Sequence, residues 1–220
     1  MALQDELYIL LARSLPACSS ATLIALVETA RIRNLHRGDS IYRQGEPVPL
    51  TLIVHGFGAA RRTTVSGQEI VSGVAPSGVL FGWSGLKSAP SSVELLALTD
   101  CDVAQWSGTD VRALAAADTA LAFAAIDSMA DSLHQTVERI EGFLHQDARR
   151  RVLRILARHR DLFFGQPAVL SRTHLPGLVG TSREMTGRVL RQLEREGTIE
   201  RFGRNGLRLL RPDQLEDSAA

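Results

Sequence analysis

Arg183, Glu184 and Arg188 have the residue types and the spacing of a surface that reads DNA bases. An arginine guanidinium matches the O6 and N7 acceptors of guanine in the major groove, and a carboxylate accepts from the N4 amino group of cytosine. Residues 184 and 188 share one face if the segment is helical, because they are four positions apart. The alternative is a solvated helical face on which these charges pair only with one another. The surrounding sequence favours base reading.

Residues 171–193, SRTHLPGLVGTSREMTGRVLRQL, have the pattern of a helix-turn-helix whose second helix enters a major groove. Ser171 stands where it can cap a first helix, and Gly180 suits the left-handed residue at that helix's end. Ser182 or Thr181 can cap the second helix. Pro176 falls inside the predicted first helix, where it removes a backbone hydrogen bond and favours a kink, but it is near enough to the N-terminus to be tolerated.

Other residues of this stretch are predicted to position DNA without reading its sequence. Hydroxyl groups can donate to phosphate oxygens, which fixes the register of the protein on the duplex. Ser171, Thr173 and Ser182 are the candidates for phosphate contacts. Thr186 and Gly187 are small enough to let the helix approach DNA closely.

Charge is distributed unevenly along the 220 residues, although the net charge is only +1. Residues 1–147 hold 10 Arg and Lys against 16 Asp and Glu, whereas residues 148–220 hold 15 Arg against 8 Asp and Glu. A basic C-terminal third on an acidic body indicates that this third meets a polyanion. The alternative is that the two parts attract each other.

The elements beside the helix-turn-helix fit a winged DNA-binding domain. Residues 147–160 predict a basic helix, and residues 162–170 a short extended link. Residues 197–209 predict a hairpin with its turn near 204–206, which would be the wing. The tail from Pro212 is expected to be loose.

A heptad pattern runs through residues 118–145, which contain no proline. A helix of about 27 residues would be about 40 Å long, and its apolar stripe is narrow and flanked by charges. We expect a two-chain coiled coil, with packing inside the same chain as the alternative. The residues of this seam are Ile126, Ala130, Leu133, Val137, Ile140 and Leu144.

Upstream, helices are predicted over residues 5–14 and 20–33, followed by short extended runs punctuated by glycine. The runs are 51–54, 59–64, 69–71, 92–97 and 101–106, with a hairpin tip at Ser66-Gly67 and a short helix over 110–116. Many short strands with regular turns predict a small antiparallel roll. The fold class is α+β, divided into residues 1–117, 118–146 and 147–220.

Composition sets further bounds. No apolar run approaches the roughly 20 residues that span a bilayer, and Asp5 and Glu6 stand where a signal peptide has positive charge. Cys18 and Cys101 are too few for a four-cysteine metal or iron–sulfur site. We expect a cytoplasmic protein without contact to membranes.

Taken together, four strings resemble the CRP/FNR family of bacterial transcription regulators over nearly the whole chain: RGDSIYRQGEP, SGQEIVSGVAPSGVLFG, LTDCDVAQW and LSRTHLPGLVGTSREMTGRVLRQLEREGTIER. The resemblance implies a homodimer that binds double-stranded, roughly palindromic DNA and acts on RNA polymerase, for instance as an activator. It also implies that Arg183, Glu184 and Arg188 read a half-site of the TGTGA or TTGA kind.

The resemblance places the effector pocket at residues 81–92, where this sequence departs from cyclic-AMP-binding members. Trp83 stands where they carry a ribose-binding glutamate, and Ser91-Ser92 stands where they carry an arginine-serine pair that holds the phosphate. Because no cation remains to meet the phosphate, cyclic AMP is not the expected effector. The residues of this region are Phe81, Gly82, Trp83, Ser84, Gly85, Ser91 and Ser92.

Other effectors stay open. FGWSGL resembles the nitrogen-oxide-responsive branch of the family, and haem would need an axial ligand, although ordinary histidines are the simpler interpretation. Either cysteine could be redox-active, with an inert thiol as the alternative, and the protein could need no ligand. No catalytic or metal site is expected, and an enzyme of the cupin type would need clustered ligands on the strands. The candidate axial ligands are His36, His55, His134, His145, His159 and His174.

Overall fold

The computed structural model describes residues 3–63 and 69–216. Of the described residues, 3–63 and 73–135 form one compact unit, and 69–72 and 136–216 form the other. The division into 1–117, 118–146 and 147–220 stays a prediction, and the predicted hairpin tip at 66–67 lies outside the described residues. Within the described part, no helix combines the length and apolar composition that crossing a bilayer requires.

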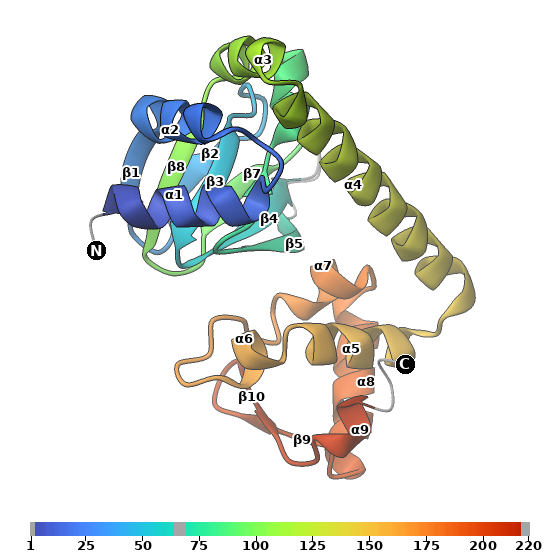
Figure 1. The fold of residues 1–220 in the computed structure, drawn as a ribbon. Helices are drawn as coiled ribbons and strands as arrows, with labels where there is room; N and C mark the ends of the chain where they lie inside the picture. The colour runs from blue at the N-terminus through green and yellow to red at the C-terminus, as the bar shows by residue number, and fades with distance from the viewer. Residues whose placement is uncertain (1–2, 64–68, 217–220) are drawn as a thin grey trace. The chain divides into compact units, whose positions relative to one another are not determined.

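The first unit is an antiparallel roll of two four-stranded sheets, as the sequence predicted (Figure 1). One sheet has the order β1-β8-β3-β6 and the other β2-β7-β4-β5. An apolar cluster that includes Ile41, Ile53, Leu95 and Val103 lies between them. The strands are β1 Arg31–Leu35, β2 Ser40–Tyr42, β3 Leu50–His55, β4 Phe57–Thr63, β5 Glu69–Pro76, β6 Leu80–Phe81, β7 Glu94–Ala97 and β8 Cys101–Trp106.

Helices cover the other face of the first sheet (Figure 1). Leu7 and Leu11 of α1 (Leu3–Ser14) and Leu26 of α2 (Ser20–Thr29) are fully buried against strand residues such as Leu52. The indole N–H of Trp106 donates to the Leu26 carbonyl at 2.7 Å, which fixes α2 on the sheet. A 3₁₀ turn η1 (Trp83–Lys87) and α3 (Gly108–Ala117) complete this layer.

The helix predicted over 20–33 is too long, because it ends at Thr29 and β1 begins at Arg31. Residues Arg31–Leu35 pair with Cys101–Gln105 of β8, a partner about seventy positions away along the chain. The alternation in RIRNL suits a strand, but nothing local stops a helix from continuing into it. Tertiary pairing therefore decides this boundary.

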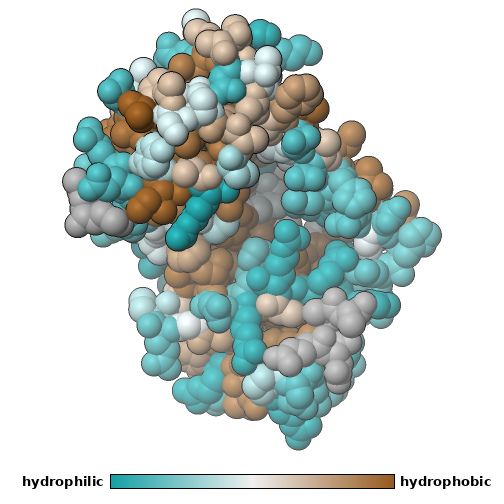
Figure 2. All heavy atoms as spheres, in the orientation of Figure 1, coloured by the Kyte–Doolittle hydropathy of each residue, from teal (hydrophilic) through white to brown (hydrophobic). Residues whose placement is uncertain are grey.

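The long helix is confirmed as α4, Thr119–His145, with 27 residues. Leu121 and Ala125 in its first two turns belong to the core beneath α1 and α2. Every predicted seam position is exposed in the single chain, and the five aliphatic side chains range from 45% at Val137 to 72% at Leu144. Phe123, three residues before Ile126, is 63% exposed and extends the same stripe. Apolar residues follow the edge of α4 at the right of Figure 2.

Asp118 joins the start of α4 to the start of α2. Its carboxylate accepts from the Thr22 hydroxyl at 2.6 Å, from the Ser19 backbone N–H at 2.9 Å and from the Ala120 N–H at 3.0 Å. These hydrogen bonds, above all that from Thr22, lower the pKa of Asp118 from 3.8 to about 2. The charged carboxylate is therefore the form that the folded chain favours.

Asp118→Asn is expected to lower the thermal unfolding midpoint at neutral pH and to have less effect in acid. The pKa is lower in the folded than in the unfolded chain, so the stabilisation is complete above pH of about 4 and disappears as the pH falls towards 2. Unfolding midpoints of both chains between these limits measure the effect. A difference that stays constant with pH would contradict a role for the charge.

The second unit is a small helical domain with a hairpin (Figure 1). Val152, Leu153 and Leu156 of the basic helix α5 and Leu190 and Leu193 of α8 are buried in it. The wing is confirmed as β9 paired with β10, with its turn at 203–205. The elements are α5 Ala148–Arg158, α6 Arg160–Phe164, α7 Leu175–Val179, α8 Arg183–Arg195, β9 Ile199–Phe202, β10 Gly206–Leu209 and α9 Asp213–Glu216.

Two expectations for this unit are wrong. The link predicted as extended over 162–170 begins inside α6, whose last residues are Leu162–Phe164. The tail from Pro212 is not loose at its start, because α9 follows and its Leu215 is 1% exposed. A single leucine buried against the domain is enough to hold so short a helix in place.

Candidate nucleic-acid interface

The first helix of the predicted helix-turn-helix is α7, and it is shorter than the sequence suggested. It begins at Leu175 with Pro176 in its first turn, where a proline lacks only an N–H that would have no helical partner. Pro176 therefore lies where a helix tolerates proline, as its place near the N-terminus predicted. Ser171 does not cap α7, because His174 occupies the cap position without a side-chain bond.

Ser171 instead closes a turn before the helix. Its backbone N–H donates to Nδ1 of His174 at 3.0 Å, and its hydroxyl oxygen lies 2.8 Å from that of Thr173. The Ser171 carbonyl accepts from the backbone N–H of His174 at 3.0 Å. These local bonds compete with capping and hold both hydroxyl groups at the entrance of the motif.

The turn between the two helices follows the predicted chemistry. Gly180 is left-handed, with φ 68° and ψ 47°, and ends α7. The Ser182 hydroxyl accepts from the backbone N–H of Met185 at 3.0 Å and caps α8. The capped helix presents its free backbone N–H groups at residues 183 and 184, together with the positive end of its dipole.

Arg183, Glu184 and Arg188 are all exposed at this end of α8. A guanidinium nitrogen of Arg188 lies 3.5 Å from Oε1 of Glu184, with side chains 64% and 82% exposed. Such an exposed pair contributes little stability, because water screens it. Breaking the ion pair between Glu184 and Arg188 would therefore cost little free energy, and each side chain could contact a base edge instead.

Thr186 does not share the exposed face. It is 2% exposed, and its hydroxyl donates to the Ser182 carbonyl at 3.0 Å. Its small side chain packs within the domain, and its part in letting α8 approach DNA closely stays a prediction. Gly187 is half-buried, whereas Thr173 and Ser182 are exposed, and Ser171 is half-buried beside Thr173.

Two arginines of this interface were missed from sequence. Arg172 donates from its backbone N–H to the Asn205 carbonyl at 3.2 Å, and its side chain donates to the Arg204 carbonyl. These bonds tie the start of the motif to the turn of the wing. Arg172 and Arg183 also line one cavity of about 370 Å³ beside Thr173 and Gly187. The predicted wing turn at 204–206 could have identified Arg204 as a candidate DNA contact. No local sequence pattern indicated that Arg172 would lie beside this turn.

The wing is held on α8 by a second arginine contact. Arg201 donates from Nε and from its backbone N–H to the Glu194 carboxylate, at 2.8 and 3.0 Å. Its side-chain hydrogen bond, followed by the backbone one, lowers the pKa of Glu194. The contact fixes the angle between the wing and the helix that carries Arg188.

In the roll, the predicted effector region is closely packed. Trp83 is 5% exposed and belongs to the core under the helices. The Ser91 hydroxyl is used locally, donating to the Val93 carbonyl at 2.5 Å. Gly82 is left-handed, and a Cβ there would lie 2.3 Å from the Pro49 carbonyl oxygen. Phe81 is half-buried, Ser84 and Ser92 are exposed, and Gly85 is buried.

The histidines do not gather into a ligand set. Both ring nitrogens of His55 are used, by Asp102 at 3.0 Å and by Glu6 at 2.9 Å, and the Asp102 hydrogen bond raises its pKa most. His159 is half-buried, and burial lowers its pKa. Across residues 3–63 and 69–216, no group of three His, Cys, Asp or Glu side chains is placed to hold a metal ion.

Both cysteines are free thiols. Cys101 is buried and Cys18 half-buried, and burial raises the pKa of each. A raised pKa keeps a thiol protonated and unreactive at neutral pH. The geometry therefore favours the inert alternative.

Two family models match the chain, one on each unit. Residues 32–118 match the cyclic nucleotide-binding domain, and residues 138–218 match the Crp-like helix-turn-helix domain. The cAMP-activated global transcriptional regulator Vfr of Pseudomonas aeruginosa is 28% identical over 193 residues, which cover 81% of this chain and 89% of Vfr.

Solved structures agree with these matches. The c-di-GMP-responsive global regulator CLP of Xanthomonas campestris is 25% identical, with a TM-score of 0.69 over 87% of this chain and 99% of that one. A CRP/FNR-family transcriptional regulator of Thermus thermophilus shares the fold at 20% identity, with a TM-score of 0.71 over 86% of this chain and 98% of that one.

Proposed function

Since the chain belongs to the CRP/FNR family of DNA-binding transcription regulators, we propose that it works as a homodimer that reads a palindromic operator with TGTGA- or TTGA-like half-sites. Arg183, Glu184 and Arg188 make the base contacts. Ser171, Thr173, Ser182, Arg172 and Arg204 contact phosphates. Binding places the protein beside RNA polymerase, which it then helps or hinders.

The observation that carries this proposal is the exposed charged end of α8. A Ser182-capped helix presents two arginines and a glutamate in its first two turns, and none of the three is held by the domain core. Arginine bidentate to guanine and glutamate to the N4 of cytosine fit G·C pairs of such a half-site. The excess of arginine over acidic residues in 148–220 attracts the DNA phosphates.

The exposed stripe of α4 supports the dimer. Five aliphatic side chains and one alanine recur at heptad spacing, and each is exposed in the single chain. An apolar seam of this length is costly in water and is covered when two such helices pack side by side. A two-fold axis through α4 would set two recognition helices about 34 Å apart, one turn of DNA.

Selection from random duplexes tests the proposal. The full-length chain, bound to a library and sequenced over several rounds, is expected to enrich an inverted repeat with G·C pairs in each half. Enrichment of a single unrepeated element, or no enrichment over a random library, would defeat it.

Ser182 provides a test of phosphate positioning that separates stability from binding. Ser182→Ala removes the cap and is expected to cost about 1 kcal/mol of domain stability. Ser182→Asp keeps an acceptor for the Met185 N–H, so stability should be retained while its charge repels phosphate and weakens DNA binding. Denaturant unfolding and gel-shift titrations measure the two effects. Equal DNA affinity of Ser182→Asp and the parent would remove Ser182 from the interface.

The proposed regulator does not respond to cyclic AMP. Trp83 fills a core position without offering an acceptor for a ribose hydroxyl, and the Ser91 hydroxyl is already bonded within its own turn. A phosphate buried without a cation is strongly disfavoured. Although Vfr is activated by cAMP, we expect a different effector here, or none.

Operator affinity is accordingly expected to be the same with and without cyclic AMP. Fluorescence anisotropy on a labelled operator measures it, with cyclic GMP as a second nucleotide. A saturable rise in affinity with cyclic AMP would overturn the assignment of this pocket, while leaving the DNA-reading surface in place.

A further inference from the structure

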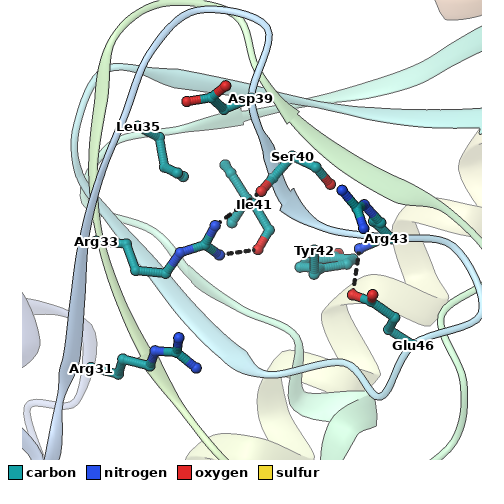
Figure 3. Close-up of a pocket in the computed structure, with 9 residues that line it drawn as sticks. All are labelled: Arg31, Arg33, Leu35, Asp39, Ser40, Ile41, Tyr42, Arg43 and Glu46. Atoms are coloured by element: carbon teal, nitrogen blue, oxygen red, sulfur yellow. Dashed lines mark hydrogen bonds between the residues drawn. The ribbon is translucent and has the colours of Figure 1, made fainter.

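A cationic cavity of about 480 Å³ opens between the edges of the two sheets, beside β1 and β2 (Figure 3). Arg31 and Arg33 of β1 and Arg43 after β2 line it, with Asp39 and Glu46. Nothing in DNA reading or in dimer formation uses these residues.

The arginines lie on the strand face where the core is expected. Side chains alternate along a strand, so Arg31, Arg33 and Leu35 share one face of β1. Leu35 belongs to the apolar cluster between the sheets, whereas Ile32, on the other face, is 36% exposed. If burial of apolar side chains alone set the register of β1, the strand would shift by one residue and Ile32 would face the interior in place of the arginines.

The neighbouring strands β8 and β3 also place polar side chains at this end of the sheet. Gln105 of β8 pairs with Arg31, and Thr51 of β3 pairs with Gln105. Gln105 is 7% exposed and Thr51 is 0% exposed, and they lie 3.4 Å apart between Nε2 and Oγ1. The interior of the roll therefore changes from apolar to polar and cationic as it reaches this opening.

Arg33 is held in place without having its charge neutralised. It donates to the Ile41 carbonyl at 2.6 Å, to Oε1 of Gln105 at 3.2 Å and to the Ser40 carbonyl at 3.2 Å. All three acceptors are neutral, and within the described residues no carboxylate forms an ion pair with Arg33. A guanidinium has five N–H groups, of which two remain for another acceptor.

Each of the two acidic residues of the cavity accepts one backbone N–H. Asp39 accepts from the N–H of His36 at 2.8 Å. Glu46 accepts from the N–H of Arg43 at 3.1 Å (Figure 3). Arg31 makes no ion pair in the part of the chain that the structure describes, and the Arg43 charge also acts on Glu94. The cavity thus holds preformed cationic donors that lack an anion.

We propose that this cavity binds a small phosphorylated molecule, with its phosphate held by Arg31 and Arg33. Guanidinium groups match phosphate oxygens in charge and in planar geometry. An adjoining cavity of about 600 Å³ shares both arginines and Tyr42 and extends to Gln105 and Asp110, which gives room and polar partners for the rest of the molecule. The phosphate lies at residues 31–43, apart from the Trp83 and Ser91 positions.

Calorimetric titration of the full-length chain with pyrophosphate tests the site. We expect saturable binding to one site per chain, with a dissociation constant below about 1 mM. Arg31→Ala should weaken it at least about tenfold, since a lost charge-assisted contact is worth about 1.4 kcal/mol or more. Arg37→Ala is the matched control, because Arg37 is exposed just after β1 but does not line the cavity.

Thermal unfolding of Arg31→Ala should match the parent without ligand, because the Arg31 side chain is exposed. No saturable binding in the parent, unchanged affinity in Arg31→Ala, or the same loss in Arg37→Ala would each overturn the proposal. Weaker operator binding by Arg31→Ala, with unchanged pyrophosphate affinity, would also contradict the proposal. The arginines would then contact DNA and not a small phosphorylated molecule.

Discussion

Arg188→Ala is expected to weaken binding to the selected operator by about 1–3 kcal/mol, which is about five- to 140-fold in the dissociation constant. Arg188 is exposed on the same face of α8 as Glu184, one turn beyond the capped N-terminus. Its ion pair with Glu184 is long and open to solvent, so the loss comes from DNA and little from the fold. Gel-shift titration at a fixed salt concentration measures it.

Arg195→Ala is the control for this change. Arg195 is exposed in the last turn of the same helix, and its loss removes the same charge far from the N-terminal end. If Arg188 reads a base, its variant loses discrimination against one mismatched pair, whereas the Arg195 variant weakens all duplexes alike. Equal, sequence-independent losses in both would reduce Arg188 to a general phosphate contact.

Glu184→Ala should behave differently from Arg188→Ala. A carboxylate near phosphates is repelled by them, so its removal costs little affinity and lowers the preference for one base pair. The two variants together separate the recognition of particular bases from the general electrostatic attraction to DNA. A Glu184 variant with the full preference of the parent would remove it from the reading surface.

Leu133→Lys is expected to dissociate the homodimer and to abolish tight operator binding. Leu133 is 66% exposed in the single chain and lies at the centre of the seam. Burying a leucine contributes about 1.5–3 kcal/mol, and a two-fold seam contains two of them. Two lysines that face each other add repulsion, so the dimer dissociation constant should rise at least about a hundredfold. Sedimentation equilibrium measures it.

Gln135→Lys makes the same charge change on the same helix but off the seam. It is exposed and should leave both association and DNA binding as in the parent. A Leu133→Lys chain that still sediments as the parent does would mean that the seam is not the dimer contact. The exposed stripe would then need another partner.

Local signals predicted most of the interface. The Ser182 cap, the left-handed Gly180 and the heptad repeat of α4 each depend on residues within a few positions of one another. Such features form wherever their short sequence occurs, unless tertiary packing opposes them. For this reason the positions of Arg183, Glu184 and Arg188 on α8 could be predicted before the fold was known.

Features that depend on distant partners could not be predicted. The helix predicted over 20–33 runs into the first three residues of β1, because β8, the partner that makes them a strand, is about seventy residues away. Arg172 became part of the interface only when the wing turn folded back onto it. Thr186 looked like a surface residue by type, yet its place on the buried face of α8 follows from packing against the rest of the domain.

Native mass spectrometry of the chain with its selected operator tests the central claim most directly. We predict two chains on each palindromic duplex, and a large loss of affinity when one half-site is scrambled, because two recognition helices must bind together. One chain per duplex, bound equally well to the intact and the half-scrambled operator, would contradict the account.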